Sequence, residues 1–372
     1  MRVGFYAPLK PPDHPVPSGD RLVARLLIQA LEMAGLEVAV MSRCRSRDGL
    51  GDPARQARLA RLGHRQVDRI LDRAAPPDLW FTYHLYHKAP DLIGPAVAAR
   101  LGIPYVVAEA SSAPKQAAGP WAAGHAAVAA ALGRAAAVIG LNPADAPCVL
   151  PLLADPARYH ALRPFLDLAP FDAAREQRLL TRASLAAQHC LDPDRPWLIA
   201  VAMMRPGDKL ASYRLLGAAL SRIQDRPWQL LVVGDGEARA EVEAALAPVA
   251  RRVAWLGAMP PCRISATLAA ADCLVWPALR EAWGMALLEA EAAGLPVVAG
   301  RVGGVPSIVV EDETGLLAAE GDEVALAGAV ARLLDDPDLR RVMGRNARAH
   351  AAAHHGLPTA ARRLDAILRG LP

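Results

Sequence analysis

The stretch Glu281-Ala-Trp-Gly-Met-Ala-Leu-Leu-Glu289 follows a short apolar run, Cys273–Trp276, and a loop that begins at Pro277. The apolar run predicts a buried strand, and the residues after the loop predict a helix over Trp283–Ala293. A buried strand followed directly by a helix is the repeating unit of α/β proteins with a parallel sheet. This stretch therefore indicates the fold class, and the rest of the chain shows how often the unit recurs.

Gly284, Met285 and Ala286 fall in the first turn of the predicted helix. First-turn N–H groups lack partners within the helix and carry a partial positive charge, which suits a phosphate. Glu281 is expected at the junction of loop and helix, and Glu289 about two turns further on. Two glutamates at this spacing are by themselves more often a dipole partner and a solvated residue, so the sequence around them decides their interpretation.

The same alternation of apolar runs and helical patterns extends in both directions along the chain. Further strands are predicted at Arg2–Ala7, Glu37–Met41, Asp78–Tyr83, Ile103–Ala108, Ala136–Leu141, Trp197–Met203, Gln229–Val233, Val253–Leu256 and Pro296–Ala299. Further helices are predicted at Leu22–Ala34, Tyr213–Ile223, Glu237–Val249, Arg263–Ala271, Glu323–Leu334 and Leu357–Leu371. Continuous apolar strands separated by helices indicate parallel sheets covered on both faces.

The alternation pauses between residues 151 and 195, where prolines and charges are frequent and no strand is predicted. We interpret this segment as an interdomain connection followed by a helix near 172–189. The expected fold is α/β, with two Rossmann-like, doubly wound parallel-sheet domains that face each other across a cleft. The expected domains are 1–168 and 169–356, and the C-terminal helix within 357–372 is expected to pack back on the first.

The sequence continues past Glu289 into Ala-Glu-Ala-Ala-Gly-Leu-Pro296-Val-Val-Ala, then Gly303-Gly-Val-Pro306, then Gly315-Leu-Leu. This succession resembles the C-terminal signature of family 4 glycosyltransferases of the GT-B fold (glycosyl transferases group 1). The motif match covers about residues 277–320, and the looser domain plan covers nearly the whole chain. The signature is specific to this broad group of enzymes and names neither a donor nor an acceptor.

The resemblance implies roles by position, with a nucleoside-diphosphate sugar as donor substrate and no further cofactor. Glu281 would contact hydroxyls of the donor sugar, and Glu289 would hold the ribose hydroxyls. The backbone N–H groups from Gly284 to Ala286 would bind the diphosphate. A carboxylate suits a vicinal diol because it can accept two charge-assisted hydrogen bonds.

Two cations and a glycine turn follow other strands of the second half. In the family, an arginine and a lysine after the strand at 197–203 neutralise the leaving nucleoside diphosphate. Arg205 and Lys209 occupy those positions at a spacing one or two residues shorter than the common pattern, and Lys209 matches better. Solvated loop cations are the alternative. Gly234, in Val233-Gly-Asp-Gly236, is a donor-binding candidate or a residue of a tight strand-to-helix turn.

In the first half, Ser18-Gly19-Asp20-Arg21 opens a helix after a proline-rich loop, Pro8–Ser18. Family members often have a glycine-containing loop here that contacts the donor phosphate or the acceptor, and Gly19 and Asp20 fit such a loop. The alternative is that Ser18 and Asp20 only cap the helix.

His84, in Tyr83-His-Leu-Tyr-His-Lys88, follows a predicted strand and is a candidate for proton transfer near neutral pH. Many family members place a histidine after the next strand, where this chain has Ala108-Glu109-Ala110-Ser111-Ser112 instead. Glu109, Ser111 and Lys115 are candidates to replace it in the acceptor or sugar pocket. The catalytic candidates are therefore Glu281, His84 and Glu109, with a purely structural histidine as the alternative for His84.

Composition excludes several other classes of protein. The net charge is only +4 and aromatic residues make up 5%, without a concentrated basic stripe, so no nucleic-acid partner is expected. The five cysteines form no CxxC pair, which favours free thiols in a reducing compartment. No Asp-x-Asp follows a strand, so no metal site is expected. No apolar stretch reaches the roughly 18–20 residues of a membrane span, so we expect a cytoplasmic protein, at most peripheral at the inner face of a membrane.

The resemblance implies a retaining, metal-independent glycosyltransferase of the hexosyltransferase class. Its acceptor would be a glycan or a lipid-linked glycan of bacterial envelope or exopolysaccharide synthesis. Two alternatives stay open: a sugar-nucleotide epimerase, and a noncatalytic nucleotide-sugar-binding partner protein, which the altered segment Glu109–Ser112 favours. A nicotinamide dehydrogenase is disfavoured because Val3–Leu22 lacks the dinucleotide fingerprint.

Overall fold

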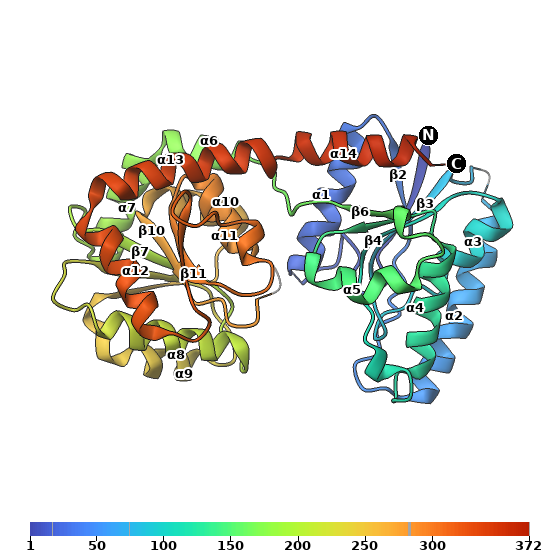
Figure 1. The fold of residues 1–372 in the computed structure, drawn as a ribbon, viewed down its shortest axis with the longest axis horizontal. Coiled ribbons are helices and arrows are strands. Elements are labelled where there is room, and N and C mark those ends of the chain that lie inside the picture. The colour runs from blue at the N-terminus through green and yellow to red at the C-terminus, as the bar shows by residue number, and fades with distance from the viewer. Residues whose placement is uncertain (17, 74, 282–283, 372) are drawn as a thin grey trace. The chain divides into compact units, whose positions relative to one another are not determined.

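A computed structural model describes residues 1–16, 18–73, 75–281 and 284–371 of the chain. The chain divides into two compact units, each treated by itself (Figure 1): Met1–Arg163 with Leu357–Pro372, and Pro164–Gly356. The first unit ends five residues before the predicted boundary at residue 168. The reason is local pairing, because the Leu166 N–H donates to the His355 carbonyl at 2.8 Å and so ties this segment to the second unit.

The first unit contains a six-stranded sheet in the order β2-β1-β3-β4-β5-β6, and every pair of neighbours is parallel. Its strands are β1 (Arg2–Tyr6), β2 (Glu37–Ser42), β3 (Leu79–Leu85), β4 (Tyr105–Ala110), β5 (Ala137–Gly140) and β6 (Tyr159–Ala161). The prediction that residues 151–195 hold no strand was wrong, because β6 lies there. A strand of three residues is too short to show the periodicity on which the prediction rests.

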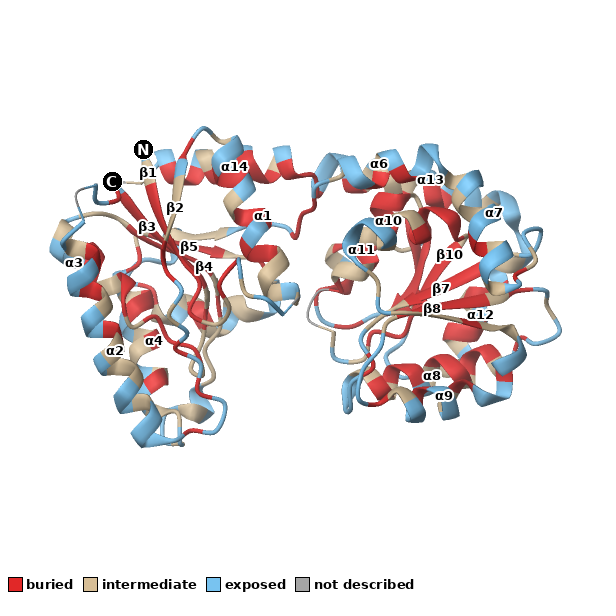
Figure 2. Cartoon of the chain, turned by 180° about the vertical axis from the view of Figure 1, so that it is seen from behind, coloured by how far each residue is buried: buried red, intermediate tan, exposed pale blue. Residues whose placement is uncertain are grey.

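Helices cover both faces of this sheet (Figure 1). They are α1 (Gly19–Met33), α2 (Pro53–Leu71), α3 (Gly94–Leu101), α4 (Ala122–Arg134), α5 (Ala146–Val149) and α14 (Leu357–Arg369). Short 3-10 turns lie at Pro114–Gln116, Pro143–Asp145, Leu150–Leu152 and Pro156–Arg158. The C-terminal helix α14 packs against α1, whereas α2 packs against α3. The strands β1, β3, β4 and β5 are buried nearly throughout (Figure 2), which is why their sequences are mostly apolar, whereas the edge strands β2 and β6 are partly exposed.

The second unit repeats the plan with the order β12-β11-β10-β7-β8-β9, again parallel throughout. Its strands are β7 (Trp197–Val201), β8 (Gln229–Val233), β9 (Val253–Gly257), β10 (Cys273–Trp276), β11 (Val297–Gly300) and β12 (Gly315–Ala318). Its helices are α6 (Ala169–Glu176), α7 (Arg178–His189), α8 (Asp208–Ser221), α9 (Arg239–Leu246), α10 (Pro261–Ala270), α11 (Met285–Ala293), α12 (Glu323–Asp335) and α13 (Pro337–His354), with 3-10 turns at Ala247–Arg252 and Val305–Ser307.

Three features of this unit differ from the sequence prediction. The single helix expected near 172–189 is two helices, α6 and α7, which are separated at Gln177. The strand β12 and the helix α13 were not predicted. The helix expected to begin at Trp283 begins at Met285, and Trp283 lies outside the described residues.

The strand order reverses once in each sheet, between β1 and β3 in the first unit and between β7 and β10 in the second. At such a point the loops that follow the two neighbouring strands leave in opposite directions, so a crevice opens beyond their carboxyl ends. Ligands of doubly wound proteins bind in this crevice. The topology therefore directs attention to the loops after β1, β3, β7 and β10.

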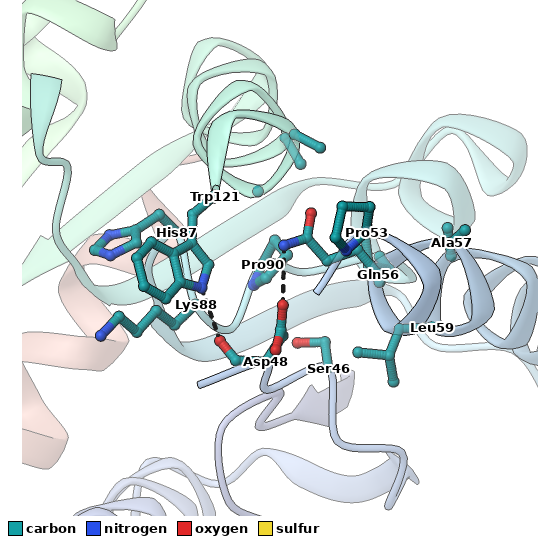
Figure 3. Close-up of a pocket in the computed structure, with 15 residues that line it drawn as sticks. Ser46, Asp48, Pro53, Gln56, Ala57, Leu59, His87, Lys88, Pro90 and Trp121 are labelled. Carbon is teal, nitrogen blue, oxygen red and sulfur yellow. Dashed lines mark hydrogen bonds between the residues drawn. The ribbon is translucent and has the colours of Figure 1, made fainter. Parts of the chain in front are cut away.

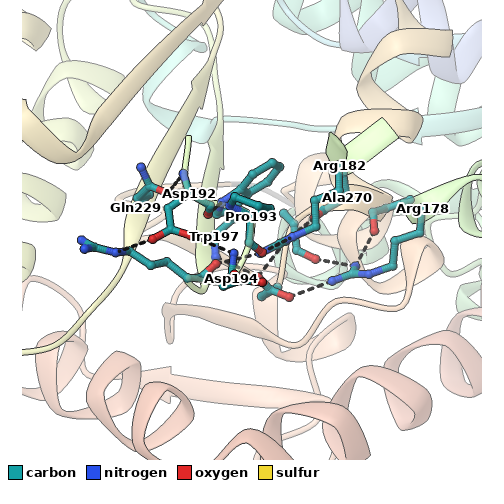
Figure 4. A network of polar contacts seen from close by, with 12 residues as sticks. Arg178, Arg182, Asp192, Pro193, Asp194, Trp197, Gln229 and Ala270 are labelled. Atoms are coloured by element: carbon teal, nitrogen blue, oxygen red, sulfur yellow. Dashed lines mark hydrogen bonds and ion pairs between the residues drawn. The ribbon is translucent and has the colours of Figure 1, made fainter. Parts of the chain in front are cut away.

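The amino ends of β7 and β10 are held by a network of polar contacts that includes Arg178, Arg182 and Trp197 (Figure 4). The Asp272 carboxylate accepts hydrogen bonds from Arg178 Nη2 at 2.7 Å, Arg182 Nη1 at 3.0 Å and the Trp197 N–H at 2.8 Å. The Arg182 guanidinium also lies 4.1 Å from the centre of the Trp197 ring. Asp272 thus joins the start of β7 to helix α7, which explains an aspartate directly before a strand.

We expect Asp272→Ala to lower the free energy of unfolding by about 3 kcal/mol, because Arg182 would keep its largely buried charge without the carboxylate. Chemical denaturation of the purified protein measures this loss. Asp335→Ala is the matched control, since Asp335 pairs with Arg226 in solvent and should change stability little. Equal stability of the two variants would contradict the structural role of Asp272.

Candidate active site

Lys209 and Glu281 meet at the point where the strand order of the second sheet reverses. Lys209 lies in the first turn of α8, after β7, and Glu281 lies in the loop between β10 and α11. The Lys209 ammonium donates to Glu281 Oε2, and it also lies 5.4 Å from the centre of the Trp276 ring. Both side chains are partly exposed, at 32% and 21%. A cation and an anion therefore stand together where the topology places a ligand crevice.

The loop that carries Glu281 has an unusual backbone. Ala278 and Arg280 adopt left-handed conformations, with φ of 58° and 50°, which cost energy for residues with a side chain. The loop is tied down by hydrogen bonds from the Glu281 N–H to the Ala278 carbonyl at 2.9 Å and from the Leu279 N–H to Ser212 Oγ at 3.1 Å. Strain held in place in this way fixes the position of the Glu281 side chain.

Helix α11 begins just after this loop. Its N-cap is Gly284, whose φ of 72° and close approach to Leu287 leave no room for a side chain: a Cβ would lie 2.8 Å from Leu287 Cδ1. The N–H groups of Met285 and Ala286 have no backbone acceptor among the described residues. N–H groups at the start of a helix can bind an anion, and their binding of a diphosphate stays a prediction.

Glu289 lies one turn into α11 rather than two, because the helix starts at Met285. Its carboxylate has neither a hydrogen-bond partner nor an ion-pair partner among the residues that the structure describes. Burial raises the pKa of Glu289 from 4.5 to about 7. The residue keeps intermediate exposure, so a ligand can reach this carboxylate, and groups with a raised pKa are frequent at binding sites.

We expect Glu289→Gln to raise the melting temperature at pH 8 and to change it little at pH 5. The unfolded carboxyl loses its proton near pH 4.5 and the folded one near pH 7, so stability falls as pH rises through this interval and stays low above it. The shift corresponds to about 3 kcal/mol at pH 8. Melting curves at both pH values test the prediction. Glu241→Gln, at an exposed glutamate, is the control. If the melting temperature of both variants depended on pH in the same way, the prediction for Glu289 would be wrong.

Arg205 and Gly234, the other two donor-binding candidates of this unit, differ in whether they have a group that is free to bind a ligand. The side chain of Arg205 is exposed and has no ion-pair partner within the described part of the chain. The Gly234 N–H already donates to the Gly257 carbonyl at 2.8 Å, and a Cβ on Gly234 would lie 1.9 Å from the Ala202 carbonyl oxygen. Gly234 therefore allows the ends of β7 and β8 to approach closely, whereas Arg205 keeps a free cation.

In the first unit, Asp20 and His84 meet at the corresponding reversal between β1 and β3. Ser18 is the N-cap of α1, because its Oγ accepts the Arg21 N–H at 3.2 Å. Asp20 is thereby free of the capping role, and its Oδ1 lies 2.9 Å from His84 Nδ1. Gly19 is exposed beside it, with nothing near the position of a Cβ. Burial lowers the pKa of His84. The hydrogen bond to Asp20 and the nearby charge of Glu109 raise this pKa by more than burial lowers it, so the net change is upward.

Glu109 lies beside His84 on the adjacent strand. Both residues were expected just after their strands, but they lie within β3 and β4, between the paired residues Tyr83–Ala108 and Leu85–Ala110. Both have left-handed backbones, with φ of 62° at His84 and 58° at Glu109. Two non-glycine residues in this conformation on neighbouring strands indicate a constrained functional site.

The carboxylate of Glu109 is poorly compensated. Its Oε2 is buried without a hydrogen-bond partner, and burial raises the pKa of Glu109 to about 7, although the charge of His84 acts in the opposite direction. At neutral pH this carboxyl exists in both protonation states beside an imidazole. The pair can therefore accept or release a proton, which is what a group next to a reacting hydroxyl needs.

Sequence reasoning missed Asp145, which follows β5 and acts electrostatically on both His84 and Glu109. Burial raises the pKa of Asp145, and a hydrogen bond from Asn142 Nδ2 at 3.0 Å opposes this. The rule that polar residues after strands form sites would have selected it. Of the other candidates there, the Ser111 N–H donates to the Leu85 carbonyl at 3.0 Å and Lys115 is exposed.

Comparison with known proteins shows which family part of this chain resembles. Residues 191–350 match the family model "Glycosyl transferases group 1". A D-inositol 3-phosphate glycosyltransferase of Corynebacterium glutamicum is 42% identical over 113 residues, which are 30% of this chain and 27% of that protein. An alpha-D-kanosaminyltransferase of Streptomyces kanamyceticus is 32% identical over 200 residues, which are 53% and 50%. The chain spans about half or less of the length of the curated relatives it matches.

Solved structures share the fold over the full chain. A sucrose-phosphate synthase of Thermosynechococcus elongatus superposes with a TM-score of 0.73 at 22% identity, covering 99% of this chain and 98% of that one. HepE of Anabaena in complex with UDP also has a TM-score of 0.73, at 17% identity, covering both chains completely. WaaG, a glycosyltransferase of lipopolysaccharide biosynthesis, has a TM-score of 0.68 at 18% identity and complete coverage of both chains. These similarities show a GT-B fold of two Rossmann-like units.

Proposed function

We propose that this chain, whose residues 191–350 belong to the glycosyl transferases group 1 family, transfers a sugar from a nucleoside-diphosphate sugar to a hydroxyl-bearing acceptor. The donor binds to the second unit at the crevice between β7 and β10. The observation that carries the proposal is the Lys209–Glu281 ion pair at this reversal of strand order, next to the N–H groups at the start of α11, which have no backbone acceptor in the described part of the chain.

Each part of a nucleotide-sugar donor has a matching group in this crevice. The diphosphate is bound by Lys209, Arg205 and the N–H groups of Met285 and Ala286, because cations and helix N-termini both favour anions. The partnerless Glu289 accepts hydrogen bonds from the ribose diol. Glu281 exchanges its contact with Lys209 for the hydroxyls of the donor sugar. The carboxylate of Glu289 thus gains partners only when the donor is bound.

The chemistry that we propose needs no metal ion. Charge on the leaving diphosphate is neutralised by Arg205, Lys209 and backbone N–H groups. Transfer retains the anomeric configuration, as the family resemblance implies, and the leaving diphosphate helps to position the acceptor hydroxyl. His84, held by Asp20, and the neighbouring Glu109 hold or accept the proton of that hydroxyl. The acceptor is a glycan or a lipid-linked glycan of envelope or exopolysaccharide synthesis.

We place the reaction on the cytoplasmic side of a membrane, in solution or at the membrane surface. Among the helices that the structure describes, none is long and apolar enough to cross a bilayer.

Thermal-shift measurements with UDP, GDP, ADP and their sugar conjugates, without metal, test the donor site. A ligand that binds only the folded protein raises its melting temperature. We expect one diphosphate to do so, and one of its sugars to do so more strongly. Release of the diphosphate on addition of acceptor identifies a transferase, whereas interconversion of two donor sugars identifies an epimerase. No shift with any diphosphate, with or without magnesium, would overturn the proposal in favour of a noncatalytic protein.

A further inference from the structure

The first unit contains a pocket of about 400 Å³ that the donor site does not use (Figure 3). It lies between helices α2 and α4 and the loops that follow β2 and β3, and we name it the α2–α4 pocket. Its walls are mostly apolar, formed by side chains such as Leu59, Pro90, Leu92 and Ala127. A cavity of this size and lining is typical of sites for small organic molecules.

A few polar groups line one part of this pocket. Ser46 is only 3% exposed, and its Oγ has no hydrogen-bond partner among the residues that the structure describes. A buried hydroxyl without a partner costs free energy, so its presence in a pocket wall points to a ligand that supplies the partner. Gln56 uses its Nε2 to donate to Asp48 and to the Pro120 carbonyl. Its amide oxygen and the Ser46 hydroxyl suit a ligand that carries hydroxyl groups.

The charges around the pocket favour a neutral ligand. Asp48 is compensated by Gln56 Nε2 at 2.9 Å and by the Leu50 N–H at 3.1 Å. The Lys88 ammonium lies 4.5 Å from the centre of the Trp121 ring, on which it is held by a cation–π contact. An anion would face Asp48 and a cation would face Lys88, so neither sign is favoured. His87 also lines the pocket, and burial and the charge of Lys88 lower its pKa, which keeps this imidazole neutral at pH 7.

A row of aromatic rings connects this pocket with His84. The ring centres are 5.2 Å apart from His84 to Tyr86, 5.5 Å from Tyr86 to His87, and 5.8 Å from His87 to Trp121. Trp121 lines the pocket, whereas His84, at the other end of the row, contacts Asp20 and lies near Glu109. Because both sites follow the carboxyl ends of strands in one sheet, a single extended molecule can reach from one to the other.

We propose that the α2–α4 pocket binds the apolar part of a neutral, hydroxyl-bearing amphiphile, and that this amphiphile is the acceptor. This inference rests on the proposed function and specifies its acceptor class. The apolar part contacts Leu59 and Leu92, and one polar group of the ligand pairs with Ser46 Oγ. The reacting hydroxyl lies at the other end of the ring row, beside His84 and Glu109.

Octyl β-D-glucoside, used as monomer and without any nucleotide, is a suitable probe because it combines neutral hydroxyls with an alkyl chain. Isothermal titration should show at least tenfold tighter binding of this probe than of glucose, because the pocket removes the apolar surface of the alkyl chain from water. Ala127→Phe, which fills the pocket, should abolish this advantage. Ala130→Phe lies on the exposed face of the same helix and should preserve it. Equal affinity of the two variants, or of the two sugars, would overturn the proposal.

Ser46→Ala separates a binding role from a structural one. If Ser46 only supported the fold, its loss would lower the melting temperature. If its hydroxyl awaits a ligand, the melting temperature stays the same or rises, and octyl glucoside binds several-fold more weakly. Unchanged probe affinity in this variant would count against the proposal. Since these titrations contain no nucleotide, their failure leaves the donor site untouched, and failure of every diphosphate shift would leave the titrations valid.

Discussion

Lys209→Met is expected to weaken the binding of the nucleoside diphosphate by about 100-fold, equivalent to about 2.7 kcal/mol. The Lys209 ammonium is the one cation that the structure, over its described residues, places in contact with Glu281 at the reversal between β7 and β10. Its replacement removes a charge-assisted hydrogen bond to phosphate and leaves Glu281 as an uncompensated anion beside it. Isothermal titration with the diphosphate that gives the largest thermal shift measures the loss.

The matched control for this prediction is Arg214→Met, which removes an exposed cation from the same helix, α8. It changes the net charge of the protein equally, so it separates a local contact from a general electrostatic effect. We expect the control to bind the diphosphate within about twofold of the unaltered protein. Comparable losses in both variants would mean that Lys209 acts only through net charge, and the donor site would have to be reassigned.

The sequence predicted the fold class and most strands because a parallel sheet buries both faces of each strand. Trp197–Val201 and residues 230–233 are apolar throughout for this reason, and their runs are unambiguous. β6 and β12 have only three and four residues; β6 is partly exposed, whereas β12 is mostly buried but too short to stand out from a loop. Their sequences consequently carry no periodic signal. Local sequence also could not show the break between α6 and α7.

In the candidate site, too, the sequence indicated some features and not others. Glu281, Glu289 and Lys209 were found because a sequence motif fixes them relative to neighbouring strands. Their contacts were not predictable: the Lys209–Glu281 pair joins residues 72 positions apart. Those contacts exist because the strand order places β7 beside β10, and strand order is not encoded in any single segment.

In the first unit no sequence motif fixes the candidate residues relative to one another. His84 and Asp20 are 64 positions apart and meet only because β3 lies beside β1. The left-handed backbones of His84 and Glu109 have no sequence signal, since glycine is the usual residue in that conformation. Asp145 was overlooked, although it follows β5 as the other polar residues follow their strands. Topology, rather than residue type, brings this group together.

The two units use their reversal points in a comparable way. In each, a helix that follows one strand supplies one member of a pair of ionisable side chains in contact, and the neighbouring strand or its loop supplies the other. Asp20 and His84 form the pair of the first unit, and Lys209 and Glu281 form that of the second. In the second unit, a bound donor has to separate the pair, because its phosphate competes with Glu281 for Lys209. That competition makes the two members respond differently to substitution.

Glu281→Gln is accordingly expected to bind the nucleoside diphosphate about fivefold more tightly than the unaltered protein, because a carboxylate no longer repels the phosphate. Turnover of the complete donor should nevertheless fall by about 100-fold, since the amide makes weaker hydrogen bonds to the sugar hydroxyls than a carboxylate does. Titration with the diphosphate and measurement of its release from the donor sugar test the two effects separately. Adding Lys209→Met should cancel the gain in affinity, because the freed ammonium is its source. Glu241→Gln, an exposed glutamate on α9, should change neither quantity. A loss of diphosphate affinity in Glu281→Gln would show that this residue holds the phosphate site together instead of binding the sugar.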